Sequence, residues 1–212
     1  YGFAIWETFY VTVLSTAFAL VLGLPLGVLL VAGDKDGILP LPRWLMHILN
    51  IVINILRSVP FLILMICVFP LTRAIVGTTV GTKATIVPLV VAAFPFVARL
   101  VETSLRELDE GVVEAAQSMG ATPFQIITKV MIPECLPGLI SSMTTALTTI
   151  LGYSAMSGVI GGGGLGKIAL SYGYYRYQTD IMIVCVILLV LMVQVFQTLG
   201  TAWVTRSDKR LR

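Results

Sequence analysis

Apolar residues gather in five long stretches along the chain, and short polar segments separate them. A bilayer core about 30 Å thick needs roughly 20 apolar residues in a helix, a length that residues 8–32 and 181–204 reach. Three further spans are predicted at 58–76, 84–100 and 137–160, where prolines are tolerated if neighbouring groups satisfy the freed carbonyls. The pattern predicts an all-α integral membrane protein with five transmembrane helices in one domain.

The segment 44–56 is apolar except for a stripe of polar residues at helical spacing. His47, Asn50 and Asn54 form this stripe together with Arg57. We expect either a helix lying in the membrane interface or a cytoplasmic extension of the second span. We interpret His47 as a polar group at headgroup level rather than a proton-transfer residue, because no acidic residue shares its stripe.

The segment 109–133 differs from the rest of the chain because it has the pattern of two short amphipathic helices. Its first part places apolar and polar residues on opposite faces, Val112, Ala116 and Met119 against Glu110, Glu114 and Gln117. Gly120 suits the left-handed residue that ends a helix, and residues 122–125 form a capping box for the next one. We expect that second helix to run to about Met131, because Pro133 lacks an amide hydrogen. Such a capped pair is suited to binding another protein.

Composition places the chain in a bilayer, since 57% of its residues are hydrophobic and only 12% are charged, against about 25% charged in soluble domains. The net charge of +3 is small and scattered, which argues against nucleic-acid binding. Cys67, Cys135 and Cys185 lie singly in apolar surroundings, so neither a disulfide framework nor a metal cluster is predicted. The chain starts at Tyr1 rather than at a methionine, so its start gives no information about a signal peptide.

Lysines and arginines are distributed unevenly between the two sides that five spans create. With the N-terminus outside, ten of the 14 fall on the cytoplasmic side and four outside. The inner group is Lys35, Arg43, Arg57, Arg99, Arg106, Lys129, Arg206, Lys209, Arg210 and Arg212, and the outer group is Arg73, Lys83, Lys167 and Arg176. The positive-inside rule therefore predicts a cytoplasmic C-terminus and a cytoplasmic position for the segment 109–133.

The fourth predicted span carries many hydroxyl groups, whereas the fifth is almost uniformly Ile, Val, Leu and Met. Ser141, Thr145 and Thr148 repeat at helical spacing on the fourth. Small hydroxylated faces allow close helix packing, and they also line polar routes through a membrane, so both interpretations stay open. By position alone, the candidate gate or pathway residues at its outer end are Ser154, Met156 and Ser157.

Two short motifs resemble catalytic or nucleotide sites without the required context. Residues 161–167 read GGGGLGK, but Ile168 stands where a P-loop needs Ser or Thr, and the run follows a membrane span on the outer side. We expect an outer loop there, flexible or tightly turned. Residues 152–156 lack the second glycine of a nucleophile elbow, and no acidic residue lies mid-span to couple proton or sodium transport. We therefore predict no catalytic residue, cofactor site or metal site in this chain.

The amphipathic pair resembles the EAA motif of ABC importer permeases. That motif reads Glu-Ala-Ala, three residues, Gly, nine residues, then apolar residues and Pro, and here Glu114, Ala115, Ala116, Gly120, Val130, Ile132 and Pro133 occupy it. The rest of the chain is similar to the methionine-importer permease family. The runs that carry this similarity are Trp6-Glu7-Thr8, Gly23-Leu24-Pro25-Leu26-Gly27, Arg57-Ser58-Val59-Pro60-Phe61 with Asn54, Pro95-Phe96-Val97-Ala98-Arg99, Gly152-Tyr153-Ser154-Ala155-Met156 and Tyr172-Gly173-Tyr174.

This resemblance implies a compact permease of the type I ABC importer fold in the bacterial inner membrane. It further implies a homodimer, two cytoplasmic ATPase subunits that bind ATP and Mg²⁺, and an external substrate-binding lipoprotein. The implied cargo is L-methionine, with D-methionine as a further candidate. The implied ATPase-coupling residues, which dock in a groove on the partner, are Glu114, Ala115, Ala116, Gly120, Ala121 and Thr122.

Two alternatives stay open. A permease of the same architecture could carry another amino acid, such as cystine. In a different class, the chain could be an integral membrane enzyme, which an ATPase and a binding lipoprotein encoded beside it would exclude.

Overall fold

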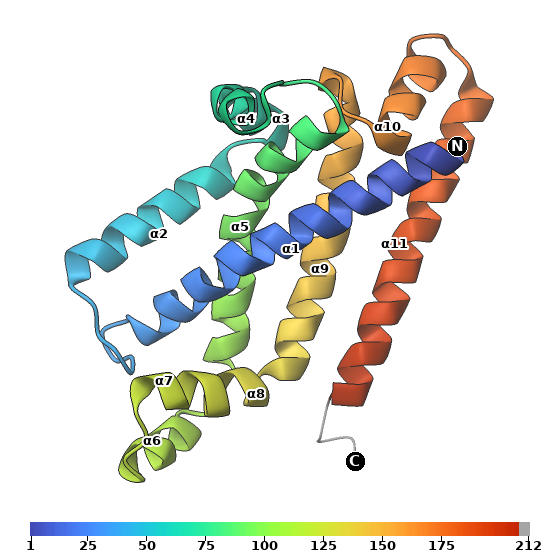
Figure 1. The fold of residues 1–212 in the computed structure, drawn as a ribbon. Helices are drawn as coiled ribbons and strands as arrows, with labels where there is room; N and C mark the ends of the chain where they lie inside the picture. Colours follow the sequence, from blue (N-terminus) through green and yellow to red (C-terminus); the bar gives the residue numbers. More distant parts are fainter. Residues whose placement is uncertain (208–212) are drawn as a thin grey trace.

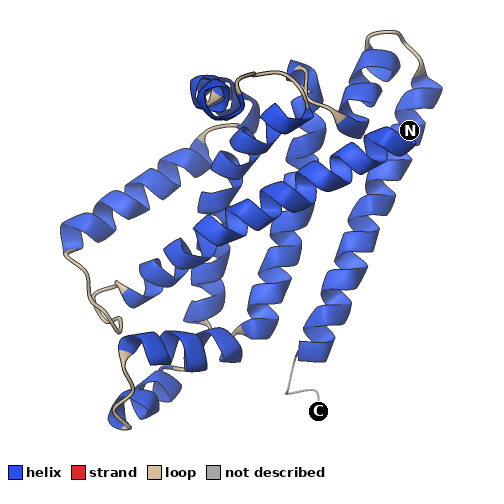
Figure 2. Cartoon of the chain, viewed as in Figure 1, coloured by secondary structure: helices blue, strands red, loops and turns tan. Residues whose placement is uncertain are grey.

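The computed structural model describes residues 1–207, and every regular element within them is a helix (Figure 2). The long helices are α1 (Gly2–Ala32), α2 (Arg43–Ser58), α5 (Thr82–Arg106), α9 (Leu136–Met156) and α11 (Thr179–Ser207). The short ones are α3 (Phe61–Cys67), α4 (Phe69–Val76), α6 (Glu110–Ser118), α7 (Pro123–Ile126), α8 (Ile132–Glu134) and α10 (Gly164–Ile168). Lys209, Arg210 and Arg212, which contribute to the predicted charge asymmetry, lie outside the described residues.

Four helices are long and apolar enough to cross a membrane: α1, α5, α9 with its continuation to Ile160, and α11. The helices α2 and α3 together supply a fifth candidate, bent by 110° between them. Figure 1 shows α5, α9 and α11 running from one end of the molecule to the other, with α1 crossing them obliquely. The predicted all-helical membrane architecture is confirmed.

The second predicted span, residues 58–76, is wrong as a single helix. Val59 is extended, and α3 begins only after Pro60. A second break follows Cys67, and α4 begins with Pro70 in its first turn. Proline lacks an N–H and disfavours the helical conformation of the residue before it, so these two prolines start new helices instead of kinking one. The polar stripe of residues 44–56 lies on α2, and the bend into α3 excludes a straight extension of a span.

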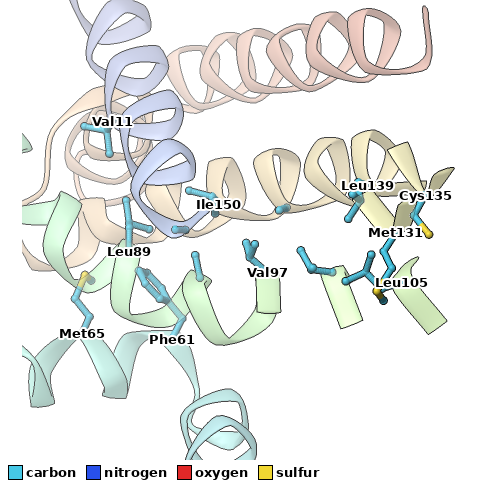
Figure 3. Close-up of a cluster of buried hydrophobic side chains, with 14 of the residues drawn as sticks. Val11, Phe61, Met65, Leu89, Val97, Leu105, Met131, Cys135, Leu139 and Ile150 are labelled. Carbon is cyan, nitrogen blue, oxygen red and sulfur yellow. The ribbon is translucent and has the colours of Figure 1, made fainter. Parts of the chain in front are cut away.

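The core forms where α1 packs along α5, with α9 beside both. Close approach depends on two glycines of α1. A Cβ on Gly23 would lie 2.7 Å from a Val97 methyl group, and one on Gly27 would lie 2.6 Å from Val101 Cβ. Figure 3 shows Val97 between Leu89 and Leu105, with Ile150 opposite. The rigid centre of the molecule therefore joins the N-terminal helix to the helix that leads into the amphipathic segment.

Helix α11 is different, because Cys185 and Gly200 are its only buried residues. It contacts α9 at Gly200, where any Cβ would overlap the Thr144 side chain. A largely apolar helix with so few buried residues is suited to lipid or to another apolar partner.

Candidate functional site

The amphipathic segment forms two helices, α6 and α7, joined by a bend at Gly120. Gly120 has φ +78, which places it in the left-handed region predicted for it. Its N–H donates to the Gln117 carbonyl at 2.9 Å, and the Ala121 N–H donates to the Ala116 carbonyl at 3.2 Å. These two bonds form a Schellman motif, which satisfies carbonyls at the end of α6.

Both helices begin with a side-chain cap. Asp109 accepts a hydrogen bond from the Gly111 N–H at 2.7 Å at the start of α6. The predicted capping box is confirmed at α7: Thr122 Oγ1 accepts from the Gln125 N–H at 3.4 Å, and Gln125 Oε1 accepts from the Thr122 N–H at 3.0 Å. The segment is therefore held by its own local bonds in one shape.

The second helix does not stop at Met131 as predicted. A π-helical turn, Ile127–Met131, follows α7 and continues directly into α8, where Pro133 lies in the first turn. A π turn shifts the hydrogen-bond register, and proline is tolerated in a first turn because its missing N–H has no partner to lose there. The helical path therefore continues from the amphipathic segment towards α9.

The exposed surface of this segment combines acidic and apolar groups. Glu114 and Ala115 are exposed, whereas Ala116 is buried at 4%. On the predicted apolar face, Ala116 is thus covered, whereas Met119 is 81% exposed. Phe124, which the sequence interpretation did not single out, is 74% exposed. Large apolar side chains exposed on adjacent turns are typical of a protein-binding surface.

A chain of ion pairs joins the C-terminal end of α5, which leads into this segment, to the connection after α1. Arg106 binds Asp34 at 2.9 Å, on the connection after α1, and Glu102 at 3.0 Å. Glu102 also pairs with Arg99 at 2.6 Å. The hydrogen bond from Arg106 holds the pKa of the Asp34 carboxyl below its usual value, and the Lys35 N–H acts in the same direction. The carboxylate is therefore charged at neutral pH.

The same chain of contacts reaches α2, which sequence reasoning missed. Arg99 donates to Asn50 Oδ1 at 2.7 Å and to Asn54 Oδ1 at 3.1 Å. The available signal was Arg99 itself, because a charge within an apolar stretch needs a polar partner. The polar stripe of α2 thus faces α5 through Asn50, while His47 is exposed. Three elements, α1, α2 and α5, are joined at the end where α6 begins.

A cavity of about 540 Å³ lies between the α1–α2 connection and α6. Its lining includes Asp34, Asp36, Glu110, Glu114 and Arg106. Carboxylates predominate there, so the surface around Glu114 is acidic and suits a basic group on a partner.

The hydroxyl groups predicted on the fourth span lie in a groove between α9 and α11. Ser141, Thr145 and Thr148 line this groove of about 350 Å³. The opposite wall contributes Gln197 and Thr201, which sequence reasoning missed. Thr145 and Thr148 donate to carbonyls of their own helix, at Ser141 and Thr145. The groove is polar although both of its helices are candidate spans.

The candidate gate residues at the end of α9 do not share one surface. Ser154 and Ser157 are buried, at 5% and 2%, whereas Met156 is 47% exposed. Ser154 Oγ lies 3.5 Å from Thr12 Oγ1 of α1 and donates to the Leu151 carbonyl at 2.7 Å. The two serines therefore belong to packing against α1, and Met156 points elsewhere.

Within residues 1–207 there is no group of three or more His, Cys, Asp or Glu side chains placed to hold a metal ion.

Comparison with known proteins identifies similar chains over nearly the full length. Residues 19–212 match the family model of the binding-protein-dependent transport system inner membrane component. The chain is 52% identical over 210 residues to the probable D-methionine transport system permease protein MetI of Vibrio cholerae, covering 98% of this chain and 92% of that one. It is 47% identical over 209 residues to the protein of the same name from Pasteurella multocida, covering 99% and 96%.

Solved structures agree with these matches. A chain from the inward-facing conformations of the MetNI methionine ABC transporter superimposes with a TM-score of 0.95 at 45% identity, covering 97% of this chain and 95% of that one. A chain from an amino acid ABC transporter crystallised with histidines has a TM-score of 0.78 at 19% identity, covering 96% and 92%. The second similarity extends to the fold alone.

Proposed function

Because this chain belongs to the family of binding-protein-dependent transport system inner membrane components, the permeases of ABC importers, we propose that it moves methionine across the inner membrane. In this proposal two copies of the chain form the translocation pathway. Two cytoplasmic ATPase subunits bind ATP and Mg²⁺, and an external lipoprotein delivers the amino acid. The observation that carries the proposal is the capped bend at Gly120, which presents Glu114, Met119 and Phe124 on one rigid segment.

We infer a membrane placement in which the helix ends lie near the two membrane surfaces. With the N-terminus outside, α1, α5, α9 and α11 cross the bilayer, and α2 with α3 makes the remaining crossing. The 16 residues of α2 rise about 24 Å, and α3, bent by 110° from it, adds no further rise along that axis, so α2 supplies most of this crossing. Arg57 then lies at the outer end of α2, unlike its predicted cytoplasmic position. Nine of the 14 basic residues stay inside, three of them beyond the described residues, which preserves the orientation.

Coupling works through the continuity of helices around the amphipathic segment. ATP closes the two ATPases, and each carries its docked α6–α7 pair with it. The movement passes to α5 at one end and through the π turn and α8 to α9 at the other. The hydrogen bond from Arg99 to Asn50 passes it to α2, and the ion pair between Arg106 and Asp34 passes it to the connection after α1. ATP hydrolysis stays in the partner, and this chain supplies the pathway.

Methionine as cargo rests on the names of the relatives and on the methionine transporter whose chain superimposes with a TM-score of 0.95. The hydroxyl-lined groove between α9 and α11 would supply polar contacts for an amino acid within the bilayer. Competition for uptake of labelled L-methionine discriminates between cargos. Unlabelled L-methionine, and D-methionine at a higher concentration, should compete in vesicles that contain the whole transporter, whereas competition by cystine alone would assign the other cargo.

Docking of the ATPase is tested by Glu114→Lys. Reversal of this charge at the acidic cavity should reduce recovery of the ATPase in co-purification. Asp180→Lys is a matched control, because Asp180 is an exposed acid in the first turn of α11, at the other end of the molecule. Equal recovery with all three chains would contradict the placement of Glu114 at the contact.

A further inference from the structure

The glycine-rich run that resembled a phosphate loop packs against α1 instead. Glu7 Oε2 accepts a hydrogen bond from the Gly164 N–H at 2.9 Å, and Glu7 Oε1 accepts from Thr82 Oγ1 at 2.5 Å. The next residue, Thr8, accepts from the Leu165 N–H at 2.9 Å through its hydroxyl oxygen. We call these five residues the outer contact. It joins α1, the start of α5 and the start of α10.

Gly163 and Gly164 lie so close to α1 and α5 that neither has room for a side chain. Gly164 has φ +80, and a Cβ there would overlap Thr8 Oγ1. A Cβ on Gly163 would overlap Thr82 Oγ1 and approach Glu7 Oε2 to 3.0 Å. Because Gly163 and Gly164 have no side chains, the backbone N–H of Gly164 can approach the carboxylate of Glu7 closely. The sequence predicted a loop here that is either flexible or tightly turned, and the structure shows a tightly turned one.

The outer contact lies directly beside the buried serines at the end of α9. The Gly162 N–H donates to the Ser157 carbonyl at 3.0 Å. Glu7, Thr8, Ser154 and Ser157 surround a space of only about 10 Å³, too small to pass an amino acid. The ends of α1, α5 and α9 are thus closed against one another at this point.

We propose that Glu7 is a positioning residue for transport, which holds the outer side closed in this conformation by tying the glycine-rich run to α1 and α5. The inference rests on the proposed function, because an outer side exists only if the chain is a permease. Hydrogen bonds to an ionised carboxylate are stronger than neutral ones, and a half-buried carboxylate accepting two of them favours the closed arrangement. The outer side opens when these bonds break.

The test compares Glu7→Ala, Glu7→Gln and Thr82→Val in vesicles that contain the ATPase subunits. Basal ATP hydrolysis without binding protein, and methionine imported per ATP with it, are measured for equal amounts of inserted complex. Loss of the outer contact should favour the outward-open, ATPase-closed state, so Glu7→Ala should raise basal hydrolysis about ten-fold and lower import per ATP. Glu7→Gln should raise basal hydrolysis less than Glu7→Ala, because its amide can still accept from Gly164 and bond to Thr82 but lacks the charge that strengthens both bonds.

Thr82→Val and a control variant, Asp180→Ala, separate this role from general destabilisation. Thr82→Val should raise basal hydrolysis less than Glu7→Ala, and should add nothing in the Glu7→Ala background, since both remove the same contact. Asp180→Ala removes an exposed acid from the same end and should behave as wild type. A chain that folds poorly would lose hydrolysis and import together.

The outcomes distinguish the two proposals. Unchanged basal hydrolysis and import per ATP in Glu7→Ala, with a coupled wild type, overturns the role of Glu7 alone. Parallel loss of both activities in Glu7→Ala and Glu7→Gln also overturns it, because the conservative variant fails to rescue. A wild type that neither binds the ATPase nor imports methionine overturns the proposed function, and this inference with it.

Discussion

The bend at Gly120 allows a quantitative prediction, because its substitution changes backbone energy without creating a clash. A Cβ on Gly120 would meet no atom within 4 Å, while its φ of +78 is strained for any L side chain. The left-handed conformation costs an L residue roughly 1–2 kcal/mol, which corresponds to a factor of about 5–30 in the population of the bent form. Gly120→Ala should therefore weaken coupling by about that factor.

The series Gly120→Asn, →Ala and →Val sharpens the prediction. Asn tolerates the left-handed region, whereas a β-branched residue tolerates it worst, so methionine imported per ATP should fall in the order Gly, Asn, Ala, Val. Gly120→Asp adds a charge to the docking surface as well and should abolish stimulated hydrolysis while leaving the chain inserted. Gly138→Ala is the matched control, because its Cβ would meet Ser104 at an ordinary 3.6 Å. Equal coupling in Ala, Val and wild type would refute the rigid-bend reasoning.

Three other substitutions test separate contacts. Gly27→Ala should destabilise the chain by about 1–3 kcal/mol, because the new methyl group overlaps Val101 in the core, and thermal unfolding in detergent measures it. Asp34→Asn removes one of the two carboxylates that pair with Arg106. Because the pKa of Asp34 is lowered on folding, the stability difference from wild type should be constant above pH 3.8 and shrink as the pH falls below it, which unfolding at several pH values tests. Phe124→Ser should leave stability unchanged and weaken ATPase binding about 10- to 100-fold, because an exposed ring packs only against a partner; undiminished binding would contradict its place in the contact.

Local patterns predicted local structure well. The capping box at residues 122–125 and the left-handed Gly120 depend only on neighbouring residues, so spacing was sufficient to find them. The break at Pro60 was not predicted, because hydropathy is the same for a kinked span and for two helices meeting at 110°. Local sequence also gave no sign of the π turn before Pro133, which depends on how the segment joins α9.

Contacts between residues far apart in the sequence could not be predicted from sequence patterns. Arg99 meets Asn50 only because α2 packs on α5, and Glu7 meets Gly164 across most of the chain. The exposure of Phe124 also could not be predicted, because an apolar residue in an amphipathic helix is expected to be buried. Candidate residues on α9 were found by their hydroxyl groups, but the wall formed by Gln197 required the packing of α11.

The most direct test of the central claim is uptake of labelled methionine into vesicles that contain this chain and its ATPase, with binding protein outside and ATP inside. The account predicts methionine accumulation that requires ATP on the side of the amphipathic segment and that falls with Gly120→Val but not with Gly138→Ala. Methionine accumulation without ATP, or unaltered accumulation in Gly120→Val, would contradict coupling through this segment.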